Sequence, residues 1–331
     1  MKEYTLFLTF FSPFQKNIPP SVPNIPLIPD LNKTLTILDF MSQEFDAVRI
    51  VGGEPLITPT FNEIIDFAVE RYRKISVESI GAGDVFRSAY NIKRQISEGS
   101  DIEIIFQLID MDPSVNDKVL GTGAWETVIS AATLVQSTFD IPPKIAMYIG
   151  SHSTHRYSLL TKLGFDLILR RAYGMKVTER SVSTMFQLAQ YENVTVEDCV
   201  YSAINNGYSC TMPKYVLDSN GNIYISRFAP DVENPIGNVF GMTMEDIHNA
   251  VANAFKPIQE AKLGGKCSKC AYAEICGGGD FHYWESLKEA YDPVCPIREE
   301  AVDELAGDEE EELAGGDDVQ DFSEEEFIDD V

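Results

Sequence analysis

The fold is decided by a stretch near the N-terminus that reads AVRIVGGEPLITPTFNEIIDFAVERYRKISVES (residues 47–79). Its first segment, 47–51, is mostly apolar and β-branched, and its last, 74–79, carries Ile75 and Val77, which predicts two strands. Between them, residues 61–73 carry apolar side chains at helical spacing. A helix between two buried strands predicts one crossover unit of a parallel sheet.

The same alternation recurs over the first two hundred residues. Further strands are predicted at 4–10, 102–109, 144–149 and 166–169, and further helices at 35–43, 89–97, 125–139 and 157–163. Six strands separated by five helices predict an α/β fold with a parallel sheet, and periodicity does not tell whether that sheet closes or stays open. From about Thr178 we expect the alternation to fade, with a hairpin formed by 215–217 and 223–226.

Charge is distributed unevenly along the 331 residues, which carry 26 Lys and Arg against 52 Asp and Glu, a formal net charge of −26. This excess argues against nucleic acid and membrane partners, because nucleic acids and anionic bilayers bind cationic surfaces. Residues 299–331 hold 17 acidic and no basic side chains, so we expect a disordered acidic tail. No apolar run approaches the roughly 20 residues that span a bilayer, and no signal-peptide pattern is present, which predicts a soluble cytoplasmic protein.

All six cysteines lie in the last 133 residues, from Cys199 onward. Three of them form a CxxCx5C pattern that three glycines follow, and 18 residues separate the third cysteine from a fourth; these are Cys267, Cys270, Cys276 and Cys295. Four thiolates at this spacing predict a metal site, either structural zinc or an iron-sulfur cluster, and disulfides are disfavoured in a reducing cytosol. We expect Cys199 and Cys210 to be small buried apolar residues.

Several segments resemble the radical S-adenosylmethionine (SAM) family with its C-terminal SPASM extension. Residues 51–56, VGGEPL, are similar to the family's GGEP motif, and 116–126 and 163–166 are similar to later parts of its core. Beyond the core, 218–225, 236–239 and the block from Cys267 to Cys295 fit the SPASM pattern, so the resemblance spans roughly residues 3–298. It implies a partial (β/α)6 barrel over 1–195, a SPASM-like four-cysteine domain over 196–298 and the acidic tail over 299–331.

The chain departs from this family at its catalytic cluster. Family members bind that cluster with a CxxxCxxC loop after the first strand, but the corresponding residues 12–20 contain no cysteine. We therefore expect radical SAM activity to be absent. One auxiliary site would need cysteines where this chain has Ser226 and Asp280, with Cys210 as its remnant. The other auxiliary site matches at all four cysteines, which implies one retained 4Fe-4S cluster, with zinc as the alternative.

The GGEP segment leaves two interpretations open. In active members of the family, Glu54 and the backbone of Gly52 and Gly53 face the methionine amino group of SAM, so the chain could bind SAM without cleaving it. Alternatively, the turn from Gly52 to Pro55 only lets the chain leave the strand tightly. The resemblance implies a pseudoenzyme that binds a peptide or a partner protein such as an intact radical SAM enzyme, in an accessory role in peptide modification. The alternative is an enzyme that uses the barrel pocket for non-radical chemistry.

Three further groups of polar residues are less informative. His152 and His155 follow the fifth predicted strand, where parallel sheets place ligands, but the serines and threonine around them favour a solvated loop. Asp110 and Asp112 could form a carboxylate pair, but no complementary acid or base can be assigned to them. His282 is expected to pack over the metal loop.

Overall fold

The computed structural model describes residues 2–9, 28–150, 164–171, 177–208, 212–225, 235–281, 284 and 288–297. The chain divides into two compact units, Met1–Pro296 and Ile297–Val331. The first unit contains every helix and strand given below.

One sheet of ten strands organises the first unit, in the order β10-β9-β8-β1-β2-β3-β4-β5-β6-β7. Its first seven strands all pair in parallel, and β8 pairs in parallel with β1. The bounds are β1 (Glu3–Phe7), β2 (Ala47–Val51), β3 (Lys74–Ser79), β4 (Asp101–Leu108), β5 (Lys144–Ile149), β6 (Asp166–Arg171), β7 (Val194–Val196), β8 (Val216–Asp218), β9 (Asn222–Tyr224) and β10 (Gly237–Asn238). The predicted parallel sheet is therefore confirmed for its first six strands.

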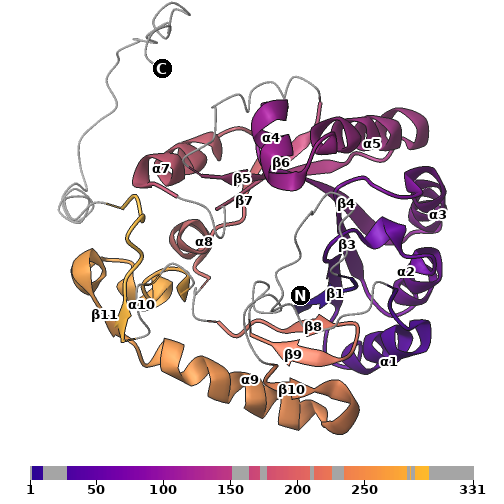
Figure 1. Cartoon of the computed structure of the whole chain (residues 1–331). Helices are drawn as coiled ribbons and strands as arrows, with labels where there is room; N and C mark the ends of the chain where they lie inside the picture. The colour runs from indigo at the N-terminus through magenta and orange to yellow at the C-terminus, as the bar shows by residue number, and fades with distance from the viewer. Residues whose placement is uncertain are drawn as a thin grey trace, which may run out of the picture. The chain divides into compact units, whose positions relative to one another are not determined.

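The sheet curves, and crossover helices lie along its outer side (Figure 1). These helices are α1 (Leu31–Met41), α2 (Phe61–Val69), α3 (Val85–Ser97), α5 (Ala124–Phe139) and α7 (Glu179–Leu188), while α4 (Pro113–Leu120) precedes α5. Helix α2 shows why they pack there, because one of its faces buries Phe61, Ile64, Ile65 and Ala68. Burial of each large apolar side chain contributes about 1.5 to 3 kcal/mol.

The β/α alternation continues beyond residue 178, so the expectation that it fades there was wrong. Helix α7, strand β7, helix α8 (Cys199–Asn206) and strand β8 extend it. Both strands are only three residues long, too short to show a period of two in the sequence. The predicted hairpin is confirmed, because β8 and β9 pair antiparallel. The predicted helix at 157–163 lies outside the described residues.

The predicted domain boundary between residues 195 and 196 falls inside β7. Strands from both sides of it share one sheet, since β8 lies beside β1. The division into a barrel and a SPASM-like domain stays a prediction.

After the sheet, helix α9 (Met244–Gln259) begins with a capping box between Thr243 and Asp246. It leads to two short strands that pair in parallel, β11 (Lys262–Leu263) and β12 (Glu289–Ala290). Between these strands lie the 3-10 turn η4 (Gly265–Lys269) and the short helix α10 (Ala273–Cys276), which carry three of the four clustered cysteines. In the part of the chain that the structure describes, no helix is long and apolar enough to cross a membrane.

Candidate functional site

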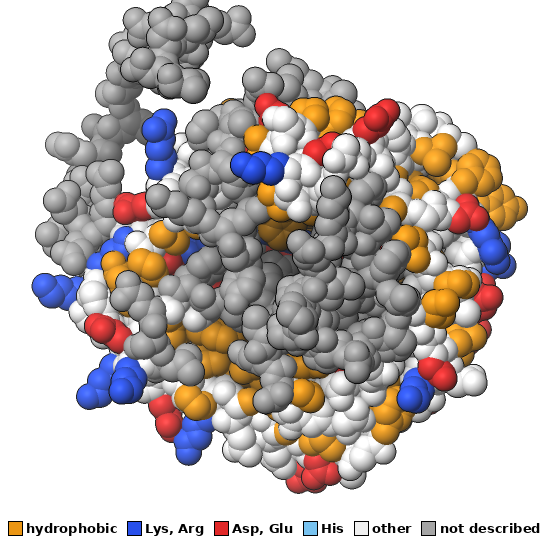
Figure 2. Space-filling view, in the orientation of Figure 1, with side chains coloured by type: hydrophobic (Ala, Val, Ile, Leu, Met, Phe, Trp, Pro, Cys, Tyr) orange, Lys and Arg blue, Asp and Glu red, His pale blue; other side chains and the backbone are white. Residues whose placement is uncertain are grey.

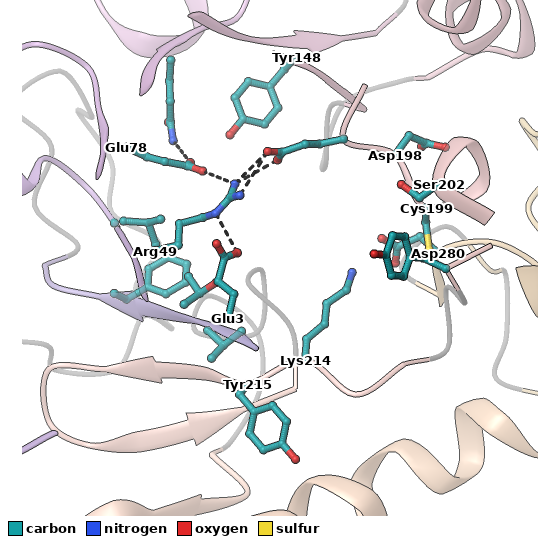
Figure 3. A pocket seen from close by; sticks show the side chains of 18 of the residues that line it. Glu3, Arg49, Glu78, Tyr148, Asp198, Cys199, Ser202, Lys214, Tyr215 and Asp280 are labelled. Carbon is teal, nitrogen blue, oxygen red and sulfur yellow. Dashed lines mark hydrogen bonds and ion pairs between the residues drawn. The ribbon is translucent and has the colours of Figure 1, made fainter. Parts of the chain in front are cut away.

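A cavity of about 600 Å³ lies on the inner side of the sheet. Its wall is formed by side chains from β1 to β5 and by the segments that follow β7 and precede β8. Seven charged residues line it, namely Glu3, Arg49, Glu78, Glu197, Asp198, Lys214 and Asp280 (Figure 3). Buried parallel strands usually carry apolar residues on both faces, so this concentration of charge needs a structural explanation.

Two arginines and three glutamates account for most of that charge, and they form ion pairs with one another. Arg170, at the end of β6, is fully buried and binds both carboxylate oxygens of Glu78, with Nη2–Oε1 at 2.7 Å and Nη1–Oε2 at 2.9 Å. Its Nε donates to Glu197 at 2.8 Å. Arg49 lies 3.0 Å from Glu78 and 3.1 Å from Glu197, and its Nε is 3.2 Å from Glu3. These five residues are called the barrel network below.

The barrel network keeps its two arginines ionised. Burial lowers the pKa of the Arg170 guanidinium, but Glu78 and Glu197 outweigh that effect and raise the pKa well above its usual range. The pKa of Arg49 is likewise raised, because Glu197 and Glu78 outweigh its burial. Gln107 adds a hydrogen bond from its Nε2 to Glu78 at 2.7 Å. The inner wall is therefore a paired polar surface that this chain builds from its own side chains.

A second buried ion cluster connects the cavity wall to the cysteine-bearing region. Arg171 pairs with Asp198, at 2.5 Å, and with Asp292. Asp198 also accepts a hydrogen bond from the amide of Tyr201 and so caps α8. Burial raises the pKa of Asp198 against the opposing effect of Arg171. All three side chains of this cluster are at most 3% exposed, so the contact between the two regions is dry.

The structure places the two halves of the GGEP segment differently. Gly52 and Gly53 line the cavity, whereas Glu54 is fully buried in the turn. The Glu54 carboxylate accepts hydrogen bonds from the amides of Leu56, Ile80 and Ala82 and from the hydroxyl of Ser79, at 2.8 to 3.1 Å. Burial raises the pKa of Glu54 to about 7, although each of these hydrogen bonds lowers it.

Backbone geometry explains the first glycine of this segment. Gly52 has φ +97°, and a Cβ there would lie 2.5 Å from the carbonyl oxygen of Thr9. Pro55 begins the 3-10 turn η1 (Pro55–Ile57), where its missing N–H costs nothing. The turn is thus fully accounted for by local structure, and a role for Gly52 to Pro55 in SAM binding stays a prediction.

The four predicted metal ligands occur as free thiols. Cys267, Cys276 and Cys295 are buried and Cys270 is partly exposed. Burial raises the pKa of the Cys276 thiol to about 12, and the neighbouring thiols of Cys295 and Cys267 raise it further. The backbone amides of Gly278 and Gly279 bond to this thiol, and the amide of Asp292 bonds to Cys267.

Thiols with amide hydrogen bonds suit a thiolate-bound metal or cluster. The donor chemistry therefore fits the predicted group. Among the described residues, however, no three His, Cys, Asp or Glu side chains are placed as a set that could bind a metal ion. The four-cysteine site stays a prediction.

Other residues singled out in the sequence have separate outcomes. Cys199 forms a disulfide, so the expectation that it is only a small apolar residue was wrong; sequence spacing does not reveal which distant thiols approach each other. Asp110 accepts the amide of Asp112 at 2.8 Å and Asp112 caps α4, so these two carboxylates shape a helix start. Outside the described residues lie residues 12–20, His152, His155, Cys210, Ser226, His282 and the acidic tail.

The residues of the barrel network were not predicted from the sequence. A signal for them existed, because Arg49 interrupts the apolar run AVRIV and Glu78 interrupts KISVES. A charged residue within a buried strand indicates a polar face. It does not identify its partners, and here Arg170 lies 92 residues from Glu78.

A curved parallel sheet with helices outside and a cavity inside is a partial (β/α) barrel, and this fold matches that of radical SAM enzyme structures. Streptococcus suis SuiB superposes with a TM-score of 0.67 at 16% identity, covering 89% of this chain and 77% of SuiB. The protein anSMEcpe with bound AdoMet superposes with a TM-score of 0.64 at 13% identity, covering 87% of this chain and 93% of the other. At such identities the likeness concerns the fold alone.

Sequence comparison points to particular relatives. Mycofactocin maturase MftC of Mycobacterium ulcerans is 23% identical over 260 residues, which are 70% of this chain and 69% of the relative. MftC of Mycobacterium tuberculosis is 22% identical over 260 residues, covering 70% and 65%. The chain thus spans about two thirds of the length of these relatives. No family model matches the sequence. These relatives support the resemblance to the radical SAM family.

Proposed function

We propose that the chain is a catalytically degenerate relative of the radical SAM enzymes that binds a peptide or a partner protein, such as an intact radical SAM enzyme. One observation carries this proposal. The first 198 residues contain no cysteine, yet the chain has the barrel and a cavity inside it. A binding role needs the cavity but not the three thiolates that a catalytic cluster requires.

Two similar structures support a peptide as the ligand. SuiB bound to precursor peptide SuiA superposes with a TM-score of 0.66 at 14% identity. The protein anSMEcpe with bound AdoMet and Cp18Cys peptide superposes with a TM-score of 0.61 at 15% identity. A cavity of about 600 Å³ has room for one or two side chains of such a ligand.

In this proposal Cys267, Cys270, Cys276 and Cys295 bind one 4Fe-4S cluster or one zinc ion. Such a group would stabilise the cysteine-bearing region, whose helices and strands are short, because metal binding contributes directly to folding. The amides of Gly278 and Asp292 support the thiolates by hydrogen bonding.

The test is the metal and sulfide content of protein purified without oxygen, for the parent and for Cys295→Ala. About four irons with matching sulfide, lost in the variant, would support the cluster. About one zinc ion would support a structural site. Cys199→Ala removes a cysteine outside the predicted set; it also breaks the Cys199 disulfide, and the metal content should stay unchanged. No metal in well-folded parent protein would contradict the four-cysteine assignment.

The alternative function is non-radical chemistry with SAM in the barrel pocket. The backbone of Gly52 and Gly53 on the cavity wall favours it, whereas the saturated carboxylate of Glu54 does not. Equilibrium dialysis with radiolabelled SAM separates the two. Saturable binding together with conversion of SAM to a product would favour the enzyme, and absence of both would favour the binding protein.

A further inference from the structure

The cavity carries an excess of acidic side chains. Five acidic and two basic residues line it among the described residues. Directly behind the wall, Arg170 and Arg171 each pair with lining carboxylates, and Asp292 shares Arg171. Six carboxylates therefore stand against four cations on and behind this wall.

The two arginines behind the wall are less accessible to a ligand than two of the carboxylates that line it. The side chain of Arg170 is fully buried and that of Arg171 is 3% exposed. By contrast, the side chains of Glu3 and Glu197 are 34% and 26% exposed. Glu78, Asp198 and Asp292 are also at most 5% exposed, so the carboxylates that a ligand can reach are Glu3, Glu197 and Asp280, against the cations Arg49 and Lys214. The accessible charge of the cavity is therefore negative, with three carboxylates against two cations.

Carboxylates stand on opposite sides of the cavity. Figure 3 shows Glu3 on the side of Arg49, and Asp280 on the far side near Cys199. Glu3 makes one ion pair, with Arg49 at 3.2 Å, which leaves acceptor capacity on its carboxylate. In the SPASM pattern that this chain resembles, an auxiliary site would need a cysteine at position 280. This chain has Asp280 there instead, and its carboxylate lies on the cavity wall.

Lys214 extends into the space between these two sides (Figure 3). It is exposed, and among the described residues it forms no ion pair. Its ammonium group thus lies within a cavity that is otherwise rich in carboxylates.

Building on the proposed peptide-binding function, we propose that the cavity takes a cationic side chain, Lys or Arg, of the bound peptide. In the free protein the Lys214 ammonium lies in the acidic space, and a ligand cation replaces it there. Glu3 and Asp280 are the carboxylates with which that cation pairs.

The experiment uses the full chain and a mixture of random hexapeptides with acetylated N-termini and amidated C-termini, so that only side chains carry charge. Peptides retained with the protein in equilibrium filtration are counted by mass spectrometry according to their net charge. We expect Lys- and Arg-bearing peptides to be enriched over neutral ones, and the enrichment to fall with added salt.

Two variants carry opposite expectations. Lys214→Gln removes the internal cation and should raise the enrichment roughly two- to five-fold, while Glu3→Gln should lower it by a similar factor. Lys256→Gln on α9 is the control for Lys214→Gln, because it changes the net charge equally at a site that does not line the cavity. Glu260→Gln, at the C-terminal end of α9, is the control for Glu3→Gln, because it removes one negative charge at a site that does not line the cavity.

The outcomes separate the two proposals. Retention with no charge preference, or with a preference for acidic peptides, would overturn this inference and leave peptide binding standing. Equal effects of Lys214→Gln and Lys256→Gln would also overturn it, since the preference would then follow net charge alone. No retention of any hexapeptide would count against peptide binding itself, and this inference would fall with it.

Discussion

The barrel wall and the cysteine-bearing region differ in how their polar groups are satisfied. In the barrel wall, Arg170 binds Glu78 through two hydrogen bonds, and Glu54 accepts hydrogen bonds from four donors. In the cysteine-bearing region, Cys276 has neighbouring thiols and two backbone amides around it, and its pKa is raised to about 12. The charged groups of the barrel network pair with one another, whereas the thiols of the cysteine-bearing region contact backbone amides and neighbouring thiols.

The difference suggests which part of the molecule depends on an added group. The barrel wall needs no added ligand to keep its geometry, because each buried charged side chain of the barrel network has an oppositely charged partner within the protein. The segment from η4 to β12 consists of short turns and two-residue strands, so we expect it to depend more on its predicted ligand. On the face seen in Figure 2, Lys and Arg side chains are interspersed with Asp and Glu, and such exposed pairs contribute little to either region.

The largest effect should follow from breaking the barrel network. Arg170→Met leaves Glu78 and Glu197 buried with an incomplete set of partners, and we expect the free energy of unfolding to fall by about 3 to 5 kcal/mol. Urea unfolding followed by circular dichroism measures this loss. Arg94→Met is the control, because its partner Asp66 is 45% exposed, and it should cost at most about 1 kcal/mol. Equal losses in the two variants would contradict the paired-wall interpretation.

The next effect is a pH dependence that Glu54 confers. Its pKa in the folded protein is about 7, above the usual 4.5, so the folded state binds this proton more tightly than the unfolded state. Stability from this group is therefore fully present below pH 4.5 and is lost as the pH rises through 7. Between pH 5 and pH 8 we expect the free energy of unfolding to fall by roughly 2 to 3 kcal/mol.

Urea midpoints of the parent and of Glu54→Gln at several pH values test this expectation. The variant is less stable overall, because its amide group faces backbone N–H donors, but its pH slope should be flatter. Parallel slopes in the two proteins would show that other groups carry the dependence.

A smaller effect should follow from loosening the contact between the two regions. Asp292→Asn removes one charged partner of Arg171, and Asp292 also accepts the amide of Val294 at 3.1 Å. We expect the local opening free energy of residues 264–296 to fall by about 2 kcal/mol, as measured by hydrogen exchange. The amides of β3 and β4 should keep their protection, and a matching loss there would show that the two regions unfold together.

The smallest effect belongs to the surface. Lys256 and Glu260 form an exposed i,i+4 pair at 3.8 Å on α9. Lys256→Met should change the free energy of unfolding by no more than about 0.5 kcal/mol, measured as for Arg170→Met. A larger loss would contradict the expectation that exposed ion pairs contribute little to the free energy of unfolding of this protein.

Much of the fold could be predicted because its signals are local. Strands β2, β3 and β5 have the predicted bounds. The hairpin strand β8 was predicted to within one residue, whereas β7 was missed because three residues cannot display a period. The site was harder to predict, because Glu78 and Arg170 are 92 residues apart and nothing local links them.

The sequence by itself determined the order of strands and helices, the glycine turn after β2, the four-cysteine pattern and the lack of cysteine before residue 199. These are properties of neighbouring residues or of composition. The tertiary structure decided that β8 lies beside β1, that the glutamate of the GGEP turn is used internally, and that two arginines and three glutamates meet inside the barrel. The physical reason is that burial and ion pairing depend on which distant segments approach each other, and that is settled only when the whole sheet forms.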